Sequence, residues 1–142
     1  MDKKRVLFVC IHNSARSQMA EAFLRELAGD RFVSESAGLE PGKLNQNVVK
    51  SMQQLGVDIS GHKTKSLFDL VKDGRHYNYI ITVCDKEAAE RCPIFPGPSL
   101  KRIHWSFKDP SAIKGEDNEV LQKIGEIRDD IKSQIESFIS EN

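Results

Sequence analysis

The chain has 142 residues, of which 39% are hydrophobic and 30% charged, and a chain of this length can bury a core without disulfides or a metal. Its 21 basic and 21 acidic side chains balance, which argues against a broad basic surface for nucleic acid or an anionic membrane. No apolar run could span a bilayer, no export signal follows Met1, and three cysteines are too few for a disulfide scaffold. We therefore expect one domain over residues 1–142, a monomer located in the cytoplasm.

Short buried strands alternate with amphipathic helices along the chain. Runs of β-branched and aromatic residues predict strands over residues 5–10, 32–37, 79–83 and 101–105. Apolar residues at helical spacing predict helices over residues 17–28, 45–55, 67–71 and 120–138. This order predicts an α/β fold with three layers, in which helices cover both faces of a central parallel sheet of four strands. Ligands are expected beyond the carboxyl ends of the strands.

The segment between the first strand and the first helix has the form of an anion-binding loop. Its residues are Cys10, Ile11, His12, Asn13, Ser14, Ala15, Arg16 and Ser17. Five residues between Cys10 and Arg16 can wrap backbone N–H groups around a tetrahedral oxyanion, next to the positive end of the helix dipole. Arg16 adds a planar fork for two oxygens, and we expect this field to lower the pKa of Cys10. Ser17 can donate its hydroxyl to the sulfur.

The alternative for this segment is a buried cysteine beside an ordinary helix-capping Ser17, with Arg16 on the surface. Asp109 offers a second marker, because it precedes Pro110 just after the fourth predicted strand, where a carboxylic acid could protonate a leaving oxygen. Alone, an Asp-Pro pair is more often a plain turn. Its position near the predicted loop favours a role in catalysis.

Residues 10–22 resemble the signature of the low-molecular-weight tyrosine phosphatases and of the arsenate reductases that share their fold. The resemblance extends over essentially the whole chain. It implies that Cys10 is the nucleophile, that the loop from Ile11 to Ala15 binds the oxyanion together with Arg16, and that Asp109 is the general acid.

Two further cysteines favour a reductase. A phosphatase needs one cysteine, whereas reduction of arsenate takes two electrons from thiols. Residues 83–93, with Cys84 and Cys92, are similar to the redox segment of thioredoxin-coupled arsenate reductases, which implies that Cys84 attacks Cys10 and that Cys92 completes the relay. If residues 85–91 are helical, the two cysteines stand roughly 12 Å apart. A disulfide tolerates about 7 Å between α-carbons, so this segment would have to unwind.

We therefore expect arsenate as substrate and thioredoxin as reductant, with glutaredoxin or a small thiol as the alternative. A phosphotyrosine phosphatase whose extra cysteines protect Cys10, and an oxyanion- or redox-sensing binding protein, remain open. Neither a metal nor a cofactor is expected, because the C-x7-C spacing of Cys84 and Cys92 lacks the close pairing of zinc sites.

The sequence departs from the family pattern at several positions. His12 and Ala15 replace a glycine and a cysteine that many relatives have, and Ser111 follows Asp-Pro where phosphatases often have tyrosine. Some relatives hold potassium beneath the loop, at positions matching Asn13, Glu21, Ser36 and an Asp that is Lys65 here. The ammonium of Lys65 would repel a cation and could fill that site itself. Asn13 is then expected to brace the loop, and His62, His76 and His104 to be structural or on the surface.

Overall fold

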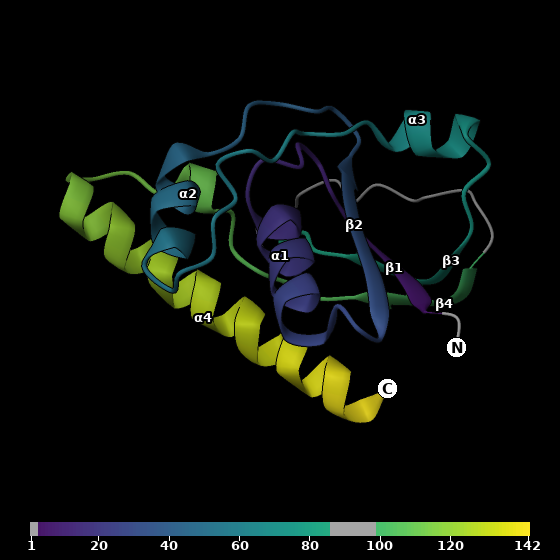
Figure 1. Ribbon diagram of the computed structural model, residues 1–142. Helices are drawn as coiled ribbons and strands as arrows, with labels where there is room; N and C mark the ends of the chain where they lie inside the picture. The colour runs from purple at the N-terminus through teal and green to yellow at the C-terminus, as the bar shows by residue number, and fades with distance from the viewer. Residues whose placement is uncertain (1–2, 86–98) are drawn as a thin grey trace.

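The computed structural model describes residues 3–85 and 99–142 (Figure 1). Within these ranges a four-stranded sheet has the order β2-β1-β3-β4. Its strands are β1 (Lys4–Cys10), β2 (Phe32–Gly38), β3 (Tyr77–Thr82) and β4 (Ser99–His104). Each neighbouring pair is parallel, so the predicted α/β fold with a parallel four-stranded sheet is confirmed. Both β3 and β4 begin two residues earlier than predicted, because Tyr77 pairs with Ser99.

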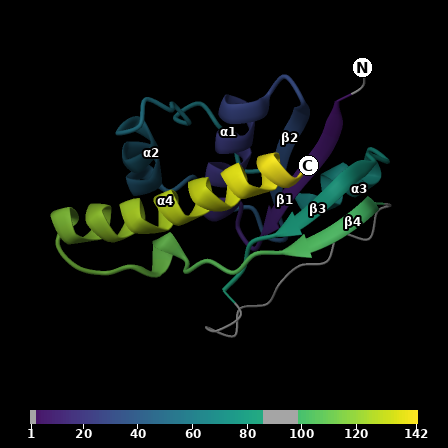
Figure 2. The ribbon, with the colours of Figure 1, turned by 90° about the horizontal axis from the view of Figure 1, so that it is seen from below.

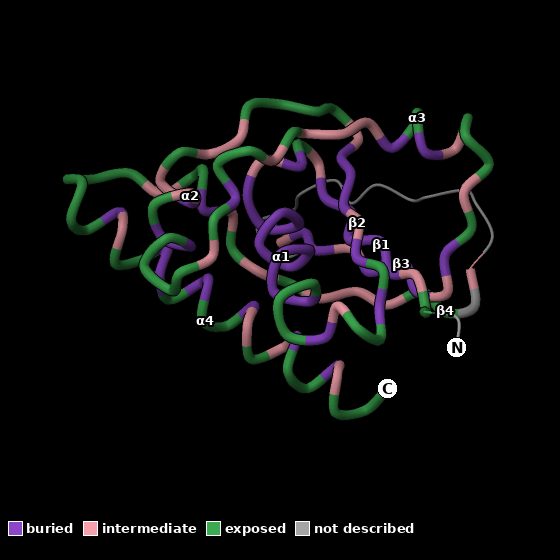
Figure 3. The backbone as a smooth tube through the Cα atoms, viewed as in Figure 1, coloured by how far each residue is buried: buried purple, intermediate pink, exposed green. Residues whose placement is uncertain are grey.

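The central strand β1 is buried on both faces. Residues Val6, Phe8 and Cys10 pack into the larger hydrophobic cluster, while Leu7 and Val9 pack into the smaller one on the opposite face. This alternation follows the two-residue period of a strand, and it explains why the sequence is apolar without interruption there. Figure 3 shows that burial is concentrated in the strands and in the first helix.

The helices cover the two faces of the sheet unequally. Helices α1 (Arg16–Ala28), α2 (Gln46–Gln53) and α4 (Asp117–Glu141) lie together on one face, and α3 (Leu67–Lys72) covers the other (Figure 2). The larger cluster takes side chains from α1, α2 and α4, and the smaller cluster takes Leu67 and Leu70 from α3. The predicted coverage of both faces is confirmed. In the described part of the chain, no helix is long and apolar enough to cross a membrane.

The four strands end at the same edge of the sheet, which brings together segments far apart in sequence. Cys10 at the end of β1 lies opposite Gly38 at the end of β2, and Val9 lies opposite Thr82 at the end of β3. Thr82 in turn lies opposite His104, the last residue of β4. The ends of β2 and β3 therefore lie on either side of the end of β1.

Candidate active site

The loop after β1 is held from outside by the backbone of residues 39–45. Amides of that segment donate to loop carbonyls, from Leu39 to Cys10 at 3.2 Å, Glu40 to Ile11 at 2.8 Å, Gly42 to His12 at 3.0 Å and Asn45 to Ser14 at 2.9 Å. The described peptide bonds are trans, so the N–H groups of residues 11, 12, 13 and 15 point away from these carbonyls. The inner side of the loop therefore presents several amides, an arrangement that suits a tetrahedral oxyanion.

Gly38 supports the loop at the closest approach of β2. A Cβ atom at this position would stand 2.8 Å from the amide nitrogen of Asn13, 2.8 Å from the carbonyl oxygen of Ile11 and 2.9 Å from the carbonyl carbon of His12. All three are backbone atoms, so no side-chain rotation could relieve the contact. From the sequence, Gly38 is only the residue that ends a strand. Its contact with the loop depends on the register of β1 and β2, which the sequence does not display.

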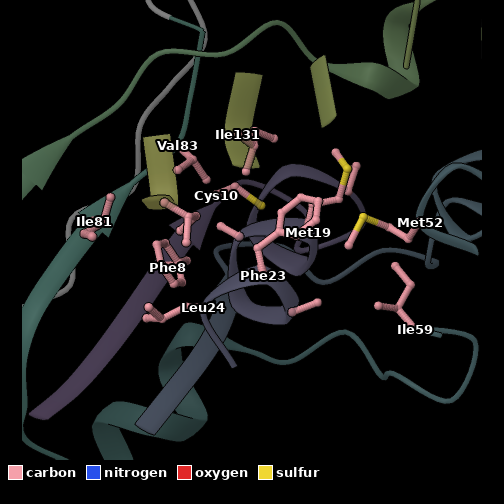
Figure 4. Close-up of a cluster of buried hydrophobic side chains, with 14 of the residues drawn as sticks. Phe8, Cys10, Met19, Phe23, Leu24, Met52, Ile59, Ile81, Val83 and Ile131 are labelled. Atoms are coloured by element: carbon pink, nitrogen blue, oxygen red, sulfur yellow. The ribbon is translucent and has the colours of Figure 1, made fainter. Parts of the chain in front are cut away.

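The Cys10 thiol lies at the inner side of this loop and borders the larger hydrophobic cluster (Figure 4). Its Sγ is 2.8 Å from the hydroxyl of Ser17 and accepts a hydrogen bond from the Asn13 amide at 3.0 Å. Burial raises the pKa of Cys10, while the Ser17 hydroxyl, the charge of Arg16 and the amides of Asn13 and Ser17 lower it. The loss of hydration outweighs these groups, so the expectation of a lowered pKa is wrong for this arrangement.

Ser17 does not cap the first helix and Arg16 does not lie on the surface, which were the alternatives left open by the sequence. Ser17 lies inside α1, and the residue that precedes the helix, Ala15, makes no side-chain capping bond. Arg16 is 4% exposed, so it is not a surface residue. Its Nη1 donates to the carbonyl oxygen of Phe107 at 3.0 Å, and its Nη2 lies 4.0 Å from Asp109 Oδ1. Arg16 therefore connects the loop after β1 with the segment after β4.

Asp109 lies at the start of a single 3-10 turn, Pro110–Ala112. Its Oδ1 accepts a hydrogen bond from the Ser111 amide at 2.9 Å, and its side chain is 30% exposed. Asn45 Nδ2 donates to Ser111 Oγ at 3.0 Å, and this bond ties the 3-10 turn to residues 39–45, which hold the loop after β1. The carboxyl group is thus fixed near Arg16 with one side open to solvent.

Cys84 comes two residues after β3 and is fully buried. The Val83 amide donates to the Val9 carbonyl oxygen at 2.9 Å, which keeps this segment beside the end of β1. Cys10 is the last residue of β1, and Cys84 follows the end of the neighbouring strand β3. Both cysteines therefore lie at the same edge of the sheet. Cys92 lies outside the described residues, as do the helix expected at 85–91 and its unwinding.

Asn13 braces the loop, as expected from the sequence. It is the one residue other than glycine with positive φ in the described chain, at 53°. Its Nδ2 donates to Ser17 Oγ at 2.8 Å, and its Oδ1 accepts bonds from the Lys65 amide at 2.9 Å and from Gln18 Nε2 at 3.0 Å. Gln18 was not anticipated, because a glutamine in a helix is usually solvent-exposed.

Beneath the loop, the buried carboxylate of Glu21 is surrounded by donors. Ser36 Oγ donates to it at 2.8 Å, Arg25 Nη2 lies at 2.8 Å and Lys65 Nζ at 3.4 Å. These residues do not fit a bound potassium ion, because Arg25 and Lys65 already supply two positive charges. Among the described residues, no cluster of histidine, cysteine and carboxylate side chains could hold a metal ion.

The four histidines have structural or surface positions. His12 is exposed, with Nδ1 3.0 Å from the carbonyl oxygen of Glu40. His76 is exposed. His104 Nδ1 lies 2.7 Å from Thr82 Oγ1 on the edge strand. His62 is half-buried behind the loop.

A thiol set in a loop of amides and arginine, at the end of the first strand of a parallel sheet, forms a candidate site for cysteine chemistry on an oxyanion. The sequence pattern of the low molecular weight phosphotyrosine protein phosphatase family matches residues 5–141, and the chain belongs to this family.

Within this family, the chain is similar to proteins that are called arsenate reductases. The chain is 40% identical to an arsenate reductase of Bacillus licheniformis over 139 residues, which are 97% of this chain and 96% of that protein. A solved structure of an arsenate reductase in the oxidized state superimposes with a TM-score of 0.78 at 27% identity, covering 97% of this chain and 98% of the other. A thioredoxin-dependent arsenate reductase of Corynebacterium glutamicum gives a TM-score of 0.60 at 27% identity, covering 94% of this chain and 62% of that one.

Proposed function

We propose that the protein is an arsenate reductase, which converts arsenate to arsenite at the Cys10 loop. The observation that carries the proposal is the placement of a second buried cysteine, Cys84, at the strand edge that holds Cys10. Hydrolysis of a phosphate ester requires only the loop and an acid, whereas reduction requires a second thiol. Full-length relatives that are called arsenate reductases support the same activity.

In the first step the Cys10 sulfur attacks arsenic and a hydroxyl leaves as water. The Cys10 thiol gives up its proton as the sulfur–arsenic bond forms, and the hydroxyl that leaves takes up one proton to become water. Asp109 is the proposed donor of that proton, and its support is a partly exposed carboxyl group 4.0 Å from Arg16 Nη2. The loop amides and Arg16 balance the negative charge of the oxyanion. The product is a covalent thioester between Cys10 and arsenic(V).

In the second step the Cys84 thiolate attacks Cys10 Sγ. The sulfur–arsenic bond breaks, and its electron pair leaves with arsenic, which becomes arsenic(III) and is released as arsenite after taking up protons. A Cys10–Cys84 disulfide remains. Cys92 then attacks Cys84, which restores the Cys10 thiol and moves the disulfide to Cys84–Cys92.

The external reductant that opens the last disulfide is proposed to be thioredoxin, with glutaredoxin or a small thiol as the alternative. The support is the thioredoxin-dependent relative from Corynebacterium glutamicum. A chain that depends on reduced cysteines also suits the cytoplasm, where thiols stay reduced.

Single-turnover assays of arsenite release test the proposal. Cys10→Ser should release none, because the first bond cannot form. Cys84→Ser should also release none, since the arsenic thioester cannot be opened. Cys92→Ser should release about one arsenite per protein and stop with Cys10 bonded to Cys84, which peptide mass mapping would detect. If Cys84→Ser and Cys92→Ser both reduce arsenate like the unmodified protein, the relay is refuted.

A further inference from the structure

Gln18 is a fully buried amide whose two ends can be told apart. Its Nε2 lies 3.1 Å from the Asn13 carbonyl oxygen, 3.0 Å from Asn13 Oδ1 and 3.0 Å from the Lys63 carbonyl oxygen. Acceptors surround this atom, so it must be the NH2 group. The other end, Oε1, lies 2.9 Å from His62 Nδ1.

The amide orientation of Gln18 fixes the tautomer of His62. An amide oxygen only accepts hydrogen bonds, so His62 Nδ1 must carry a proton. Its Nε2 then accepts from Arg25 Nη1, which lies 3.4 Å away, as a neutral ring requires. Burial lowers the pKa of His62, as do Arg25 and Lys65, against Glu21 and Asp58, which raise it. The neutral ring that donates through Nδ1 is therefore consistent with its surroundings.

At its other end, Gln18 holds a residue in an unfavourable conformation. Asn13 has φ of 53°, in the left-handed region that costs energy for residues other than glycine. Gln18 bonds both the carbonyl and the side-chain oxygen of Asn13, so it constrains the backbone and the side chain together. Asn13 in turn places its N–H on Cys10 Sγ and its side-chain amide on Ser17 Oγ.

We propose that Gln18, oriented by His62, is a positioning residue for the Cys10 nucleophile. Hydrogen bonds run without a break from His62 through Gln18, Asn13 and Ser17 to Cys10, at 2.9, 3.0, 2.8 and 2.8 Å. Gln18 touches neither sulfur nor oxyanion. It acts by keeping Asn13 left-handed, so that the Asn13 amide and the Ser17 hydroxyl stay on the sulfur and favour its thiolate. This inference deepens the proposed function, since it takes Cys10 as the reacting thiol.

Alkylation of Cys10 by iodoacetamide, followed by peptide mass mapping across a pH series, tests the inference in the full chain. Gln18→Met keeps the length of the side chain and removes its hydrogen bonds. We expect its Cys10 to react about tenfold more slowly at neutral pH, as the loss of one or two hydrogen bonds implies, with the profile moved to higher pH. Gln122→Met, at an exposed glutamine of α4, is the matched control and should react like the unmodified protein.

Two substitutions of His62 separate positioning from mere packing. Asn places an NH2 group where Nδ1–H stands, whereas Leu fills similar space without a donor, and neither carries a charge. His62→Asn should keep the Cys10 reaction rate, and His62→Leu should slow it in the same direction as Gln18→Met. This pair decides the question if Gln18→Met does not fold.

A folded Gln18→Met protein with the unmodified rate and pH profile would overturn the inference, even if its melting temperature falls. Equal rates for His62→Asn and His62→Leu would overturn it as well. Alkylation reports on the thiol whether or not arsenite is made. A failure of the arsenite assay would therefore refute the proposed function and leave this test intact.

Discussion

Gly38→Ala is the substitution for which the structure gives the sharpest expectation. The added methyl group would meet three backbone atoms of the loop at 2.8 to 2.9 Å, whereas ordinary van der Waals contact begins near 3.4 Å. The loop or the end of β2 must therefore move by about half an ångström, because well-packed backbone cannot absorb the overlap in place. The affected peptide groups include the Asn13 amide, which bonds Cys10 Sγ.

The expected size of the effect follows from overpacking and from misplacement of the loop. Inserting a methyl group into a packed region costs about 1–3 kcal/mol of unfolding free energy, or about 2–4 °C in melting temperature for each kcal/mol. Displacing reacting groups by up to an ångström can cost about a hundredfold in rate. We therefore expect kcat/KM for arsenate to fall by tenfold to about a hundredfold, a larger loss than the change in stability alone explains.

Thermal melting and steady-state arsenate reduction, measured side by side, provide the assay. Gly61→Ala is the matched control, because a Cβ there meets nothing within 4 Å and its φ is not in the left-handed region. That control should leave both quantities unchanged or raise stability slightly. If Gly38→Ala behaves like Gly61→Ala, then β2 does not shape the loop, and the close approach of Gly38 has no role in positioning Cys10.

Three further outcomes follow from the same geometry. Arg16→Lys keeps the charge and loses the fork, so kcat/KM for arsenate should fall by about a hundredfold, and a near-normal value would reject Arg16 as an oxyanion ligand. Replacing sodium by potassium at constant ionic strength should change neither melting temperature nor turnover, because Lys65 Nζ lies 3.4 Å from Glu21; a potassium-specific rise would show a cation site. The pKa of His62 in the folded chain is below its ordinary 6.5, so the unfolded chain binds more protons, and the free energy of unfolding should fall as the pH drops below about 6.5. The melting temperature of His62→Asn should depend less on pH in this range than that of the unmodified protein. An equal dependence of the two melting temperatures on pH would contradict this expectation.

The parts of the site that are contiguous in sequence could be predicted, and the parts that depend on strand register could not. Cys10 and Arg16 lie in one short loop, so spacing alone places them together. Gly38 touches that loop only because β2 pairs with β1 in a particular register. The pKa of Cys10 depends on how completely its thiol is buried, and no local pattern reports burial.

His12, which departs from the glycine of the family pattern, contributes to the shape of the loop mainly through its backbone. The His12 carbonyl accepts from Gly42, and its ring bonds the Glu40 carbonyl oxygen, so this residue faces the supporting segment and the solvent. The His12 side chain is exposed, so it is accommodated without crowding the loop. Because the backbone supplies the inward amides, only positions whose side chains turn inward are restricted. We therefore expect the departure at position 12 to leave the chemistry of Cys10 unaltered.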